Sequence, residues 1–291
     1  MRDEILELYR EAGRVASRIL REGVAMVRVD GSILSVVEAV EARVREEGAG
    51  LAFPLNLSLN EDAAHDTATP GDPRIFRKGD MVKLDLGVQL DGYIADTAST
   101  VDLGDSPRLV EASREALEAA IARVRPGVIT GELGAVIQQE IEGRGFRPVA
   151  NLTGHGLDRY RIHGPPTIPN IAIQGGAVLQ EGMAFAIEPF ASTGTGMVSD
   201  APRIQIFQQI ADKPVRLPAA REILTQVKDR NGLPFARRWL DGSRVEIGLA
   251  TLVRTSILHA YPVLHDRPGS LVSQAEHTLI VTGEGALVTT R

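Results

Sequence analysis

Residues 81–101, MVKLDLGVQLDGYIADTASTV, decide the fold of this chain. Apolar residues alternate through the first half, and the Asp-Gly pair at 91–92 is a dipeptide that tight β-hairpins favour. With this pair as the turn, Gly87 lies opposite Asp96. Asp85 is then the diagonal neighbour of Asp96 on the same face, about 7–8 Å away between backbones. The stretch therefore predicts a hairpin that presents two aspartates from one face.

Two carboxylates that converge repel each other and lose hydration unless a cation joins them. Asp85 and Asp96 therefore fit either a metal site or two aspartates on a solvated strand face, and the hairpin alone does not decide between these. The chain contains no cysteine. A metal here would therefore be held by oxygen and imidazole ligands.

The composition is that of an ordinary globular protein. Its 291 residues are 24% charged and 43% hydrophobic, enough for one large domain or two small ones. The net charge of -6 disfavours nucleic acid as the main partner, because phosphate binding depends on basic patches. The start of the chain lacks the apolar segment of a signal peptide, and no apolar run reaches about 18–20 residues. We therefore expect no membrane span and a cytoplasmic location.

Four helices are predicted from apolar residues at helical spacing. The first covers 3–22 and ends at Gly23, and the second follows Ser32 as its N-cap. The third follows Ser106, with proline at its first position, and the fourth has Thr130 as its N-cap. Because two strands are followed by two helices, we expect an α+β fold and not a doubly wound sheet.

Two glutamates enter apolar runs later in the chain. Residues 181–190, EGMAFAIEPF, resemble a nearly continuous buried strand that carries Glu188. Such strands rarely hold an unpaired glutamate, so Glu188 fits either a buried ion pair or a metal ligand. Gly182 precedes Glu188 at the spacing at which another glycine precedes Asp85, which hints at a duplicated half. Glu276 enters a second apolar run near the C-terminus.

Three histidines lie in predicted loops or short strands. His65 follows a short strand predicted at 55–59, and a lone loop histidine is usually a surface residue. His155 and His163 share the Gly/Pro-rich segment 151–170, which favours a functional loop or short strand.

Residues 199–258 differ from the rest of the chain in their pattern of apolar residues. A strand-like stretch at 204–210 is followed by helical patterns at 217–231, 234–240 and 243–258. We expect a helical insert subdomain here, within a single catalytic domain that spans 1–291.

The buried-looking acids and one imidazole can together neutralise two divalent cations. They are Asp85, Asp96, His155, Glu188 and Glu276. With them in this order, the chain resembles, nearly end to end, the archaeal form of the type 2 methionine aminopeptidases, which are pita-bread metallohydrolases. The matching motifs are FPLNLSLNEDAAH (53–65), KLDLGVQLDGYIADTA (83–98), LTGHG (152–156), IH (162–163), AIEPF (186–190), YP (261–262) and QAEHT (274–278).

The resemblance implies an antiparallel sheet with pseudo-two-fold halves covered by helices, plus a helical insert. It implies two divalent ions (cobalt, manganese, iron, zinc or nickel), with Asp85 on one ion, His155 and Glu188 on the other, and Asp96 and Glu276 bridging. The implied catalytic residues are His65, His163 and Glu188. The implied substrate-binding residues are Phe53, Pro54, His65, His163 and Tyr261.

The implied function is removal of the N-terminal (initiator) methionine from nascent proteins and peptides by metal-activated water. The implied protein is a monomer that acts on nascent chains, with transient ribosome association and without membrane or specific nucleic acid. Two alternatives stay open: an Xaa-Pro aminopeptidase or prolidase-like enzyme, and a non-catalytic binding module of the same fold. The insert and the FPLNLSLN motif disfavour the first, and the five intact ligands disfavour the second.

Overall fold

The computed structural model describes all 291 residues, which form six α-helices, two short 3-10 helices and sixteen strands. The helices are α1 (Asp3–Met26), α2 (Ile33–Glu46), α3 (Pro107–Ile121), α4 (Thr130–Gly143), α5 (Pro218–Val227), η1 (Lys228–Arg230), η2 (Arg237–Trp239) and α6 (Val245–Arg254). None of them is both long and apolar enough to cross a membrane.

The strands belong to four small antiparallel sheets. The first contains β1 (Gly50–Leu51), β2 (Asn56–Leu59), β4 (Met81–Leu90) and β5 (Tyr93–Asp102). The second contains β6 (Arg147–Pro148), β10 (Phe190–Ser192) and β14 (Val272–Gln274). The third contains β3 (Asp62–Ala64), β11 (Ser199–Gln209), β12 (Phe235–Ala236) and β13 (Leu258–His265). The fourth contains β7 (Thr153–Asp158), β8 (Arg161–Pro169), β9 (Ala184–Ile187), β15 (His277–Thr282) and β16 (Gly285–Val288).

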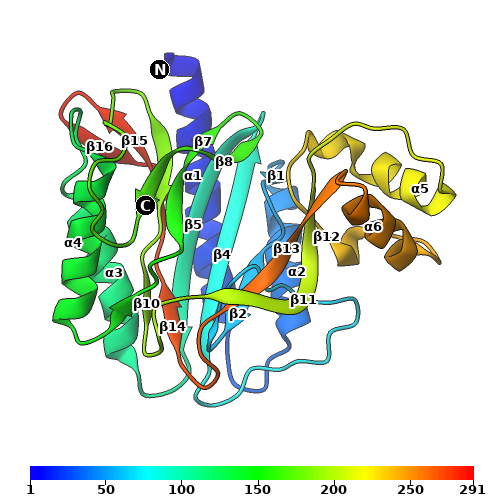
Figure 1. Cartoon of the computed structure of the whole chain (residues 1–291), viewed down its shortest axis with the longest axis horizontal. Helices are drawn as coiled ribbons and strands as arrows, with labels where there is room; N and C mark the ends of the chain where they lie inside the picture. The colour runs from blue at the N-terminus through cyan, green and yellow to red at the C-terminus, as the bar shows by residue number, and fades with distance from the viewer.

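The long hairpin β4–β5 runs through the middle of the molecule and is backed by α1, which also packs against α2 (Figure 1). Its register pairs Leu90 with Tyr93 and Gly87 with Asp96, as the sequence predicts. The two turn residues at 91–92 both have positive φ, of 48° and 86°, which the Asp-Gly pair allows. The predicted hairpin is confirmed residue by residue.

Helix α1 continues to Met26, past the predicted end at Gly23. A Cβ on Gly23 would lie 2.7 Å from a side-chain carbon of Val40 on α2, so this glycine allows two helices to pack closely. The prediction that Ser32 caps α2 is confirmed, since its hydroxyl accepts a hydrogen bond from the Ser35 N–H at 3.2 Å.

The second half repeats the first in outline, with α3 and α4 packed against strands (Figure 1). One apolar cluster lies under α1 and α2, and a second lies under α3 and α4. Thr130 is the first residue of α4 and not its N-cap, because its hydroxyl accepts a hydrogen bond from the Ala177 N–H at 3.2 Å. The α+β prediction is confirmed.

The sequence predicts a single strand over the apolar stretch 181–190. The structure has two strands there instead. Strand β9 ends at Ile187 and β10 begins at Phe190. Pro189 has no N–H to donate to a ladder, so pairing is interrupted there. The chain passes from the fourth sheet to the second, and Glu188 occupies the junction.

Residues 199–258 contain α5 and α6 but also the long strand β11, which lies across the front of the hairpin (Figure 1). The helix predicted at 234–240 is wrong, because this stretch forms β12 and η2. A separate apolar cluster that includes Phe207, Phe235 and Leu252 packs α5 and α6 against these strands. The boundaries of the insert stay a prediction.

Candidate metal centre and substrate cavity

Backbone pairing brings three of the five predicted metal ligands together. Asp85 faces Ala98 across the hairpin, and Ala98 forms an isolated antiparallel bridge with Glu276. The Thr278 hydroxyl accepts from the Asp96 N–H at 2.7 Å and donates to the Asp96 carbonyl at 2.8 Å. These contacts fix the C-terminal strands beside the hairpin.

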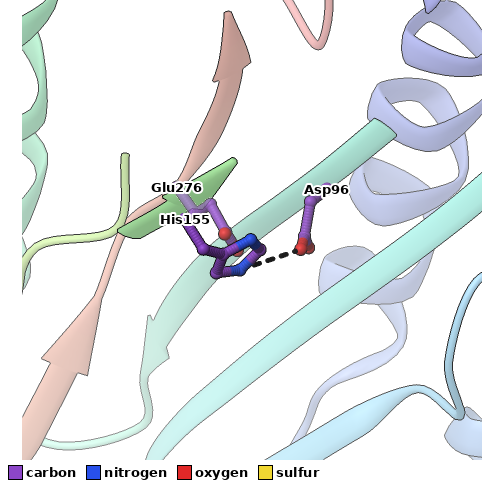
Figure 2. Close-up of side chains that lie close together, drawn as sticks. All are labelled: Asp96, His155 and Glu276. Atoms are coloured by element: carbon purple, nitrogen blue, oxygen red, sulfur yellow. Dashed lines mark ion pairs between the residues drawn. The ribbon is translucent and has the colours of Figure 1, made fainter. Parts of the chain in front are cut away.

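The other two ligands come from the second half of the chain. His155 lies on β7, and its Nε2 is 3.7 Å from both Asp96 Oδ2 and Glu188 Oε1. One ligand atom each from Asp96, His155 and Glu276 lies within 4.8 Å of the others. Figure 2 shows these three side chains converging from different strands. The five residues thus form a single cluster.

The carboxylates of this cluster lack the partners that buried charges need. Oxygens of Asp85, Asp96 and Glu276 are buried without any hydrogen-bond donor, and both oxygens of Glu276 are in this state. No lysine or arginine lines the cavity around them. The nearby Lys83 ammonium donates to the carbonyls of Asn60, Met81 and Val272, so it is held by backbone.

Burial and mutual repulsion determine the protonation of these groups. Burial raises the pKa of Asp85 to about 6, although a hydrogen bond from Gln274 opposes this. Burial, followed by repulsion from Asp85, raises the pKa of Asp96 and of Glu188 well above the usual range. Burial lowers the pKa of His155 to about 3, so its imidazole is neutral at pH 7. Unpaired carboxylates around a neutral imidazole fit divalent cations, and an oxygen-rich set favours hard ions.

The cluster lines a cavity of about 220 Å³. The apolar part of the lining includes Phe53, Ile162, Phe190, Ile206 and Pro234. Gly87 is required here, because a Cβ at this position would lie 2.2 Å from the Phe53 ring. The glycine between the two aspartates therefore lets an aromatic wall approach the cluster.

His65, His163 and Tyr261 line the same cavity. The ring centroids of His163 and His155 are 4.7 Å apart, and those of His65 and Tyr261 are 5.2 Å apart. His65 has a positive φ of 64°, and its Nδ1 is buried without a partner. His163 remains accessible to solvent through the cavity. Two imidazoles are thus available to a ligand beside the carboxylates.

All but one of the predicted site residues line this cavity. Pro54 is the exception: it is buried, and its carbonyl accepts a hydrogen bond from the Asn56 side chain at 3.1 Å. His277 lies outside the cavity and contacts Thr290, as expected from strand alternation.

Sequence reasoning missed several polar residues at the site, of which Asn56 and Gln274 lie nearest to the predicted ligands. Asn56 lies opposite Asp85 in the β2–β4 pair and lines the cavity, with its Oδ1 unpartnered. The Gln274 amide donates to Asp85 at 3.2 Å and to Glu188 at 3.4 Å. Gln274 precedes Glu276 by two residues, so strand alternation was the signal that could have found it.

The sequence profile of Metallopeptidase family M24 matches residues 7–217. The chain belongs to family M24. A curated member of similar length, the methionine aminopeptidase of Archaeoglobus fulgidus, is 48% identical over 292 residues, which covers 100% of both chains. The family M24 enzymes use two divalent metal ions, and the cluster described above fits this cofactor.

Solved structures show the fold of this family M24 chain. A thermophilic Arx1 superposes with a TM-score of 0.88 over 99% of this chain and 91% of the other, at 19% identity. The methionine aminopeptidase of Thermotoga maritima superposes with a TM-score of 0.75 over 100% and 98%, at 24% identity. These similarities concern the fold alone, and they confirm the predicted pita-bread architecture.

Proposed function

We propose that this chain is a type 2 methionine aminopeptidase, which hydrolyses the first peptide bond of nascent proteins and peptides and releases their N-terminal methionine. The observation that carries the proposal is the cluster of four carboxylates and one neutral imidazole that line one small cavity, with carboxylate oxygens buried and unpartnered. The full-length similarity to an archaeal methionine aminopeptidase supports it.

The metal ligands in this proposal are Asp85, Asp96, His155, Glu188 and Glu276. When bound, the two ions supply an activated water and polarise the scissile carbonyl group. A cavity of about 220 Å³ lined by the carboxylate cluster is of a size to accept one side chain, so we expect the cut to fall after the first residue. Phe53 and Tyr261 form part of the wall against which an unbranched apolar side chain packs.

The remaining roles fall to three side chains. Glu188 accepts the proton of the attacking water, and the Gln274 amide orients its carboxylate from 3.4 Å. His163 donates a hydrogen bond to the scissile carbonyl oxygen, where negative charge develops. His65 faces the substrate on the Tyr261 side of the cavity. Histidines that are neutral at pH 7 suit these roles, because a neutral imidazole donates a hydrogen bond without adding positive charge beside the ions.

The wider setting is part of the same proposal. The chain acts as a single catalytic domain, 1–291, with the insert at about 199–258. It works as a cytoplasmic monomer on nascent chains with N-terminal methionine, and transient ribosome contact is compatible with this role. Its negative net charge supports the absence of a specific nucleic-acid partner.

The decisive experiment is a peptide competition on chelated protein reloaded with Mn²⁺ or Co²⁺. We expect release of methionine from Met-Gly-Met and little turnover of Xaa-Pro peptides. Preference for Xaa-Pro would overturn the proposal in favour of a prolidase-like enzyme. Absence of any peptidase activity after reloading would favour a binding module.

A further inference from the structure

A buried ionic cluster joins the insert to the N-terminal half, outside the cavity. We define the anchor cluster as Glu41 of α2 together with Arg230, Arg238 and Trp239 of the insert. Building on the proposed function, we propose that the anchor cluster sets the width of the substrate slot and thereby its selectivity for an unbranched first side chain. Its members are positioning residues, because none of them lines the cavity.

Glu41 is the centre of the anchor cluster and only 2% exposed. One of its carboxylate oxygens accepts from Arg238, and the other accepts from the Trp239 indole N–H at 2.8 Å. The same carboxylate also accepts from the backbone N–H of Leu55 at 3.2 Å. A single buried carboxylate therefore holds the insert and the 53–56 segment in one place.

Arg230 forms a second connection between the same two parts. Its guanidinium donates to the carbonyl of Leu51 at 2.9 Å, to that of Ala52 at 3.3 Å and to that of Pro234 at 2.6 Å. The planar fork of arginine spans acceptors on two chain segments, which a lysine ammonium cannot do with the same geometry. The guanidinium also lies 5.1 Å from the centre of the Trp239 ring.

Arg238 extends the anchor cluster to the segment that carries His65. Besides Glu41, it donates to the Thr67 hydroxyl at 2.9 Å and to the Ala68 carbonyl at 3.4 Å. Its side chain is 5% exposed, so these partners replace water around the charge. The cluster thus bonds Leu51, Ala52 and Leu55, then Thr67 and Ala68, and finally the distant Pro234.

Three of the residues that the anchor cluster bonds, Ala52, Leu55 and Pro234, lie at or next to a residue of the cavity wall. Phe53 follows Ala52, Asn56 follows Leu55, and Pro234 is itself bonded through its carbonyl. Phe53 and Pro234 belong to the apolar part of the lining, one from the N-terminal half and one from the insert. Their separation depends on the anchor cluster, because its arginine fork bonds the backbone at both.

None of the five predicted metal ligands is hydrogen-bonded to a member of the anchor cluster. Asp85, Asp96 and Glu276 are positioned by the hairpin and by its bridge to the C-terminal strands. Loosening the anchor cluster should therefore widen the slot without changing metal binding or the hydrolytic step. A change in selectivity at constant metal content would show that the anchor cluster controls selectivity. A purely structural anchor would not give this result.

The test compares Arg230→Lys with the matched control Arg237→Lys on metal-loaded protein. Arg237 is the same residue type in the same insert, but it pairs with the exposed Glu246. Steady-state kinetics would use peptides that begin with methionine, norleucine, leucine or isoleucine. Metal content per chain would be measured on the same samples.

We expect Arg230→Lys to raise KM for the methionine peptide about tenfold and to reduce its preference over the branched residues by at least as much. This is the range in which one methylene changes selectivity. The kcat for methionine and the metal content should stay near the wild-type values, and Arg237→Lys should match wild type throughout. Unchanged selectivity in a folded Arg230→Lys protein would overturn the inference.

A second, more conservative variant keeps the inference testable if Arg230→Lys does not fold. Trp239→Phe removes the indole donor to Glu41 and keeps an aromatic ring beside Arg230. It should shift selectivity in the same direction by a smaller factor, and wild-type selectivity there would count against the anchor cluster. If wild type releases no methionine from any peptide, the proposed function fails as well. If wild type is active but the anchor-cluster variants lower kcat equally for all peptides, only this inference is overturned.

Discussion

Glu276 and Asp266 are both almost fully buried, at 1% and 2% exposure, but their surroundings are opposite. Asp266 accepts hydrogen bonds from the hydroxyls of Ser192 and Thr195 and from the N–H groups of Gly196 and Arg267. Both oxygens of Glu276 have no donor at all. Asp266 lies outside the cavity and its charge is satisfied by the protein, whereas Glu276 lines the cavity without a donor.

The pKa of each carboxyl group reflects this difference. Burial opposes ionisation of Asp266, but the hydrogen bonds from Ser192 and Thr195 outweigh it and lower its pKa to about 2. Burial and the neighbouring Asp96 raise the pKa of Glu276 well above its usual range. Burial of a carboxylate is therefore no sign of function by itself. Burial without any partner in the protein indicates a place for a cation.

Glu41 falls between Glu276 and Asp266, since its charge is paired but its pKa is still raised. It is as buried as Asp266, and Arg238 and Trp239 satisfy its charge. Burial nevertheless raises its pKa. A buried carboxylate that is paired in this way holds structure together, and in this chain it holds the insert against the cavity wall.

The largest expected effect comes from Asp96→Asn in the unpaired cluster. Activity should fall by more than about a thousandfold, because one of the proposed metal ligands loses its charge. Metal analysis should show fewer ions per chain. Wild-type metal content in this variant would remove Asp96 from the ligand set.

His163→Ala should give the next largest effect. Loss of one donor to the developing oxyanion is expected to lower kcat by about a hundredfold or more. Metal content should stay at the wild-type level, since His163 is not among the proposed ligands. A kcat equal to that of wild type would exclude His163 from the mechanism.

Removing the charge of Asp96 and removing the charge of Asp266 should change the stability of the fold in opposite directions. In chelated protein, Asp96→Asn should raise Tm, because it relieves repulsion in an unpaired cluster. Asp266→Asn should lower the free energy of unfolding by about 2–3 kcal/mol, because donors around it lose a charged acceptor. Calorimetry on both chelated variants checks this, and shifts of the same sign would refute the contrast.

The smallest effect is the pH dependence that Asp266 confers. Its folded pKa of about 2 lies below the ordinary value of 3.8, so it stabilises the fold above about pH 4. This stabilisation is lost as the pH falls from about 4 to about 2, and it amounts to about 1–2 kcal/mol. The stability difference between wild type and Asp266→Asn, both chelated, should shrink by this amount between pH 5 and pH 2. A constant difference across that range would contradict the assignment.

Local patterns in the sequence determined the hairpin and the capped start of α2 at Ser32. The register that places Asp85 beside Asp96 depends only on strand alternation and on the Asp-Gly turn, both encoded within about twenty residues. The resemblance to a known family added the order of the five predicted ligands. Site roles that rest on it stay predictions until variants are measured.

Tertiary structure alone decided where the distant groups meet. Glu276 reaches the hairpin through a bridge to Ala98, and Pro189 turns Glu188 out of its strand. Pro54 is buried and does not line the cavity, although its neighbour Phe53 does. The anchor cluster pairs Glu41 with Arg238, nearly two hundred positions later in the chain. No local period encodes such contacts, because they depend on how two halves and an insert pack together.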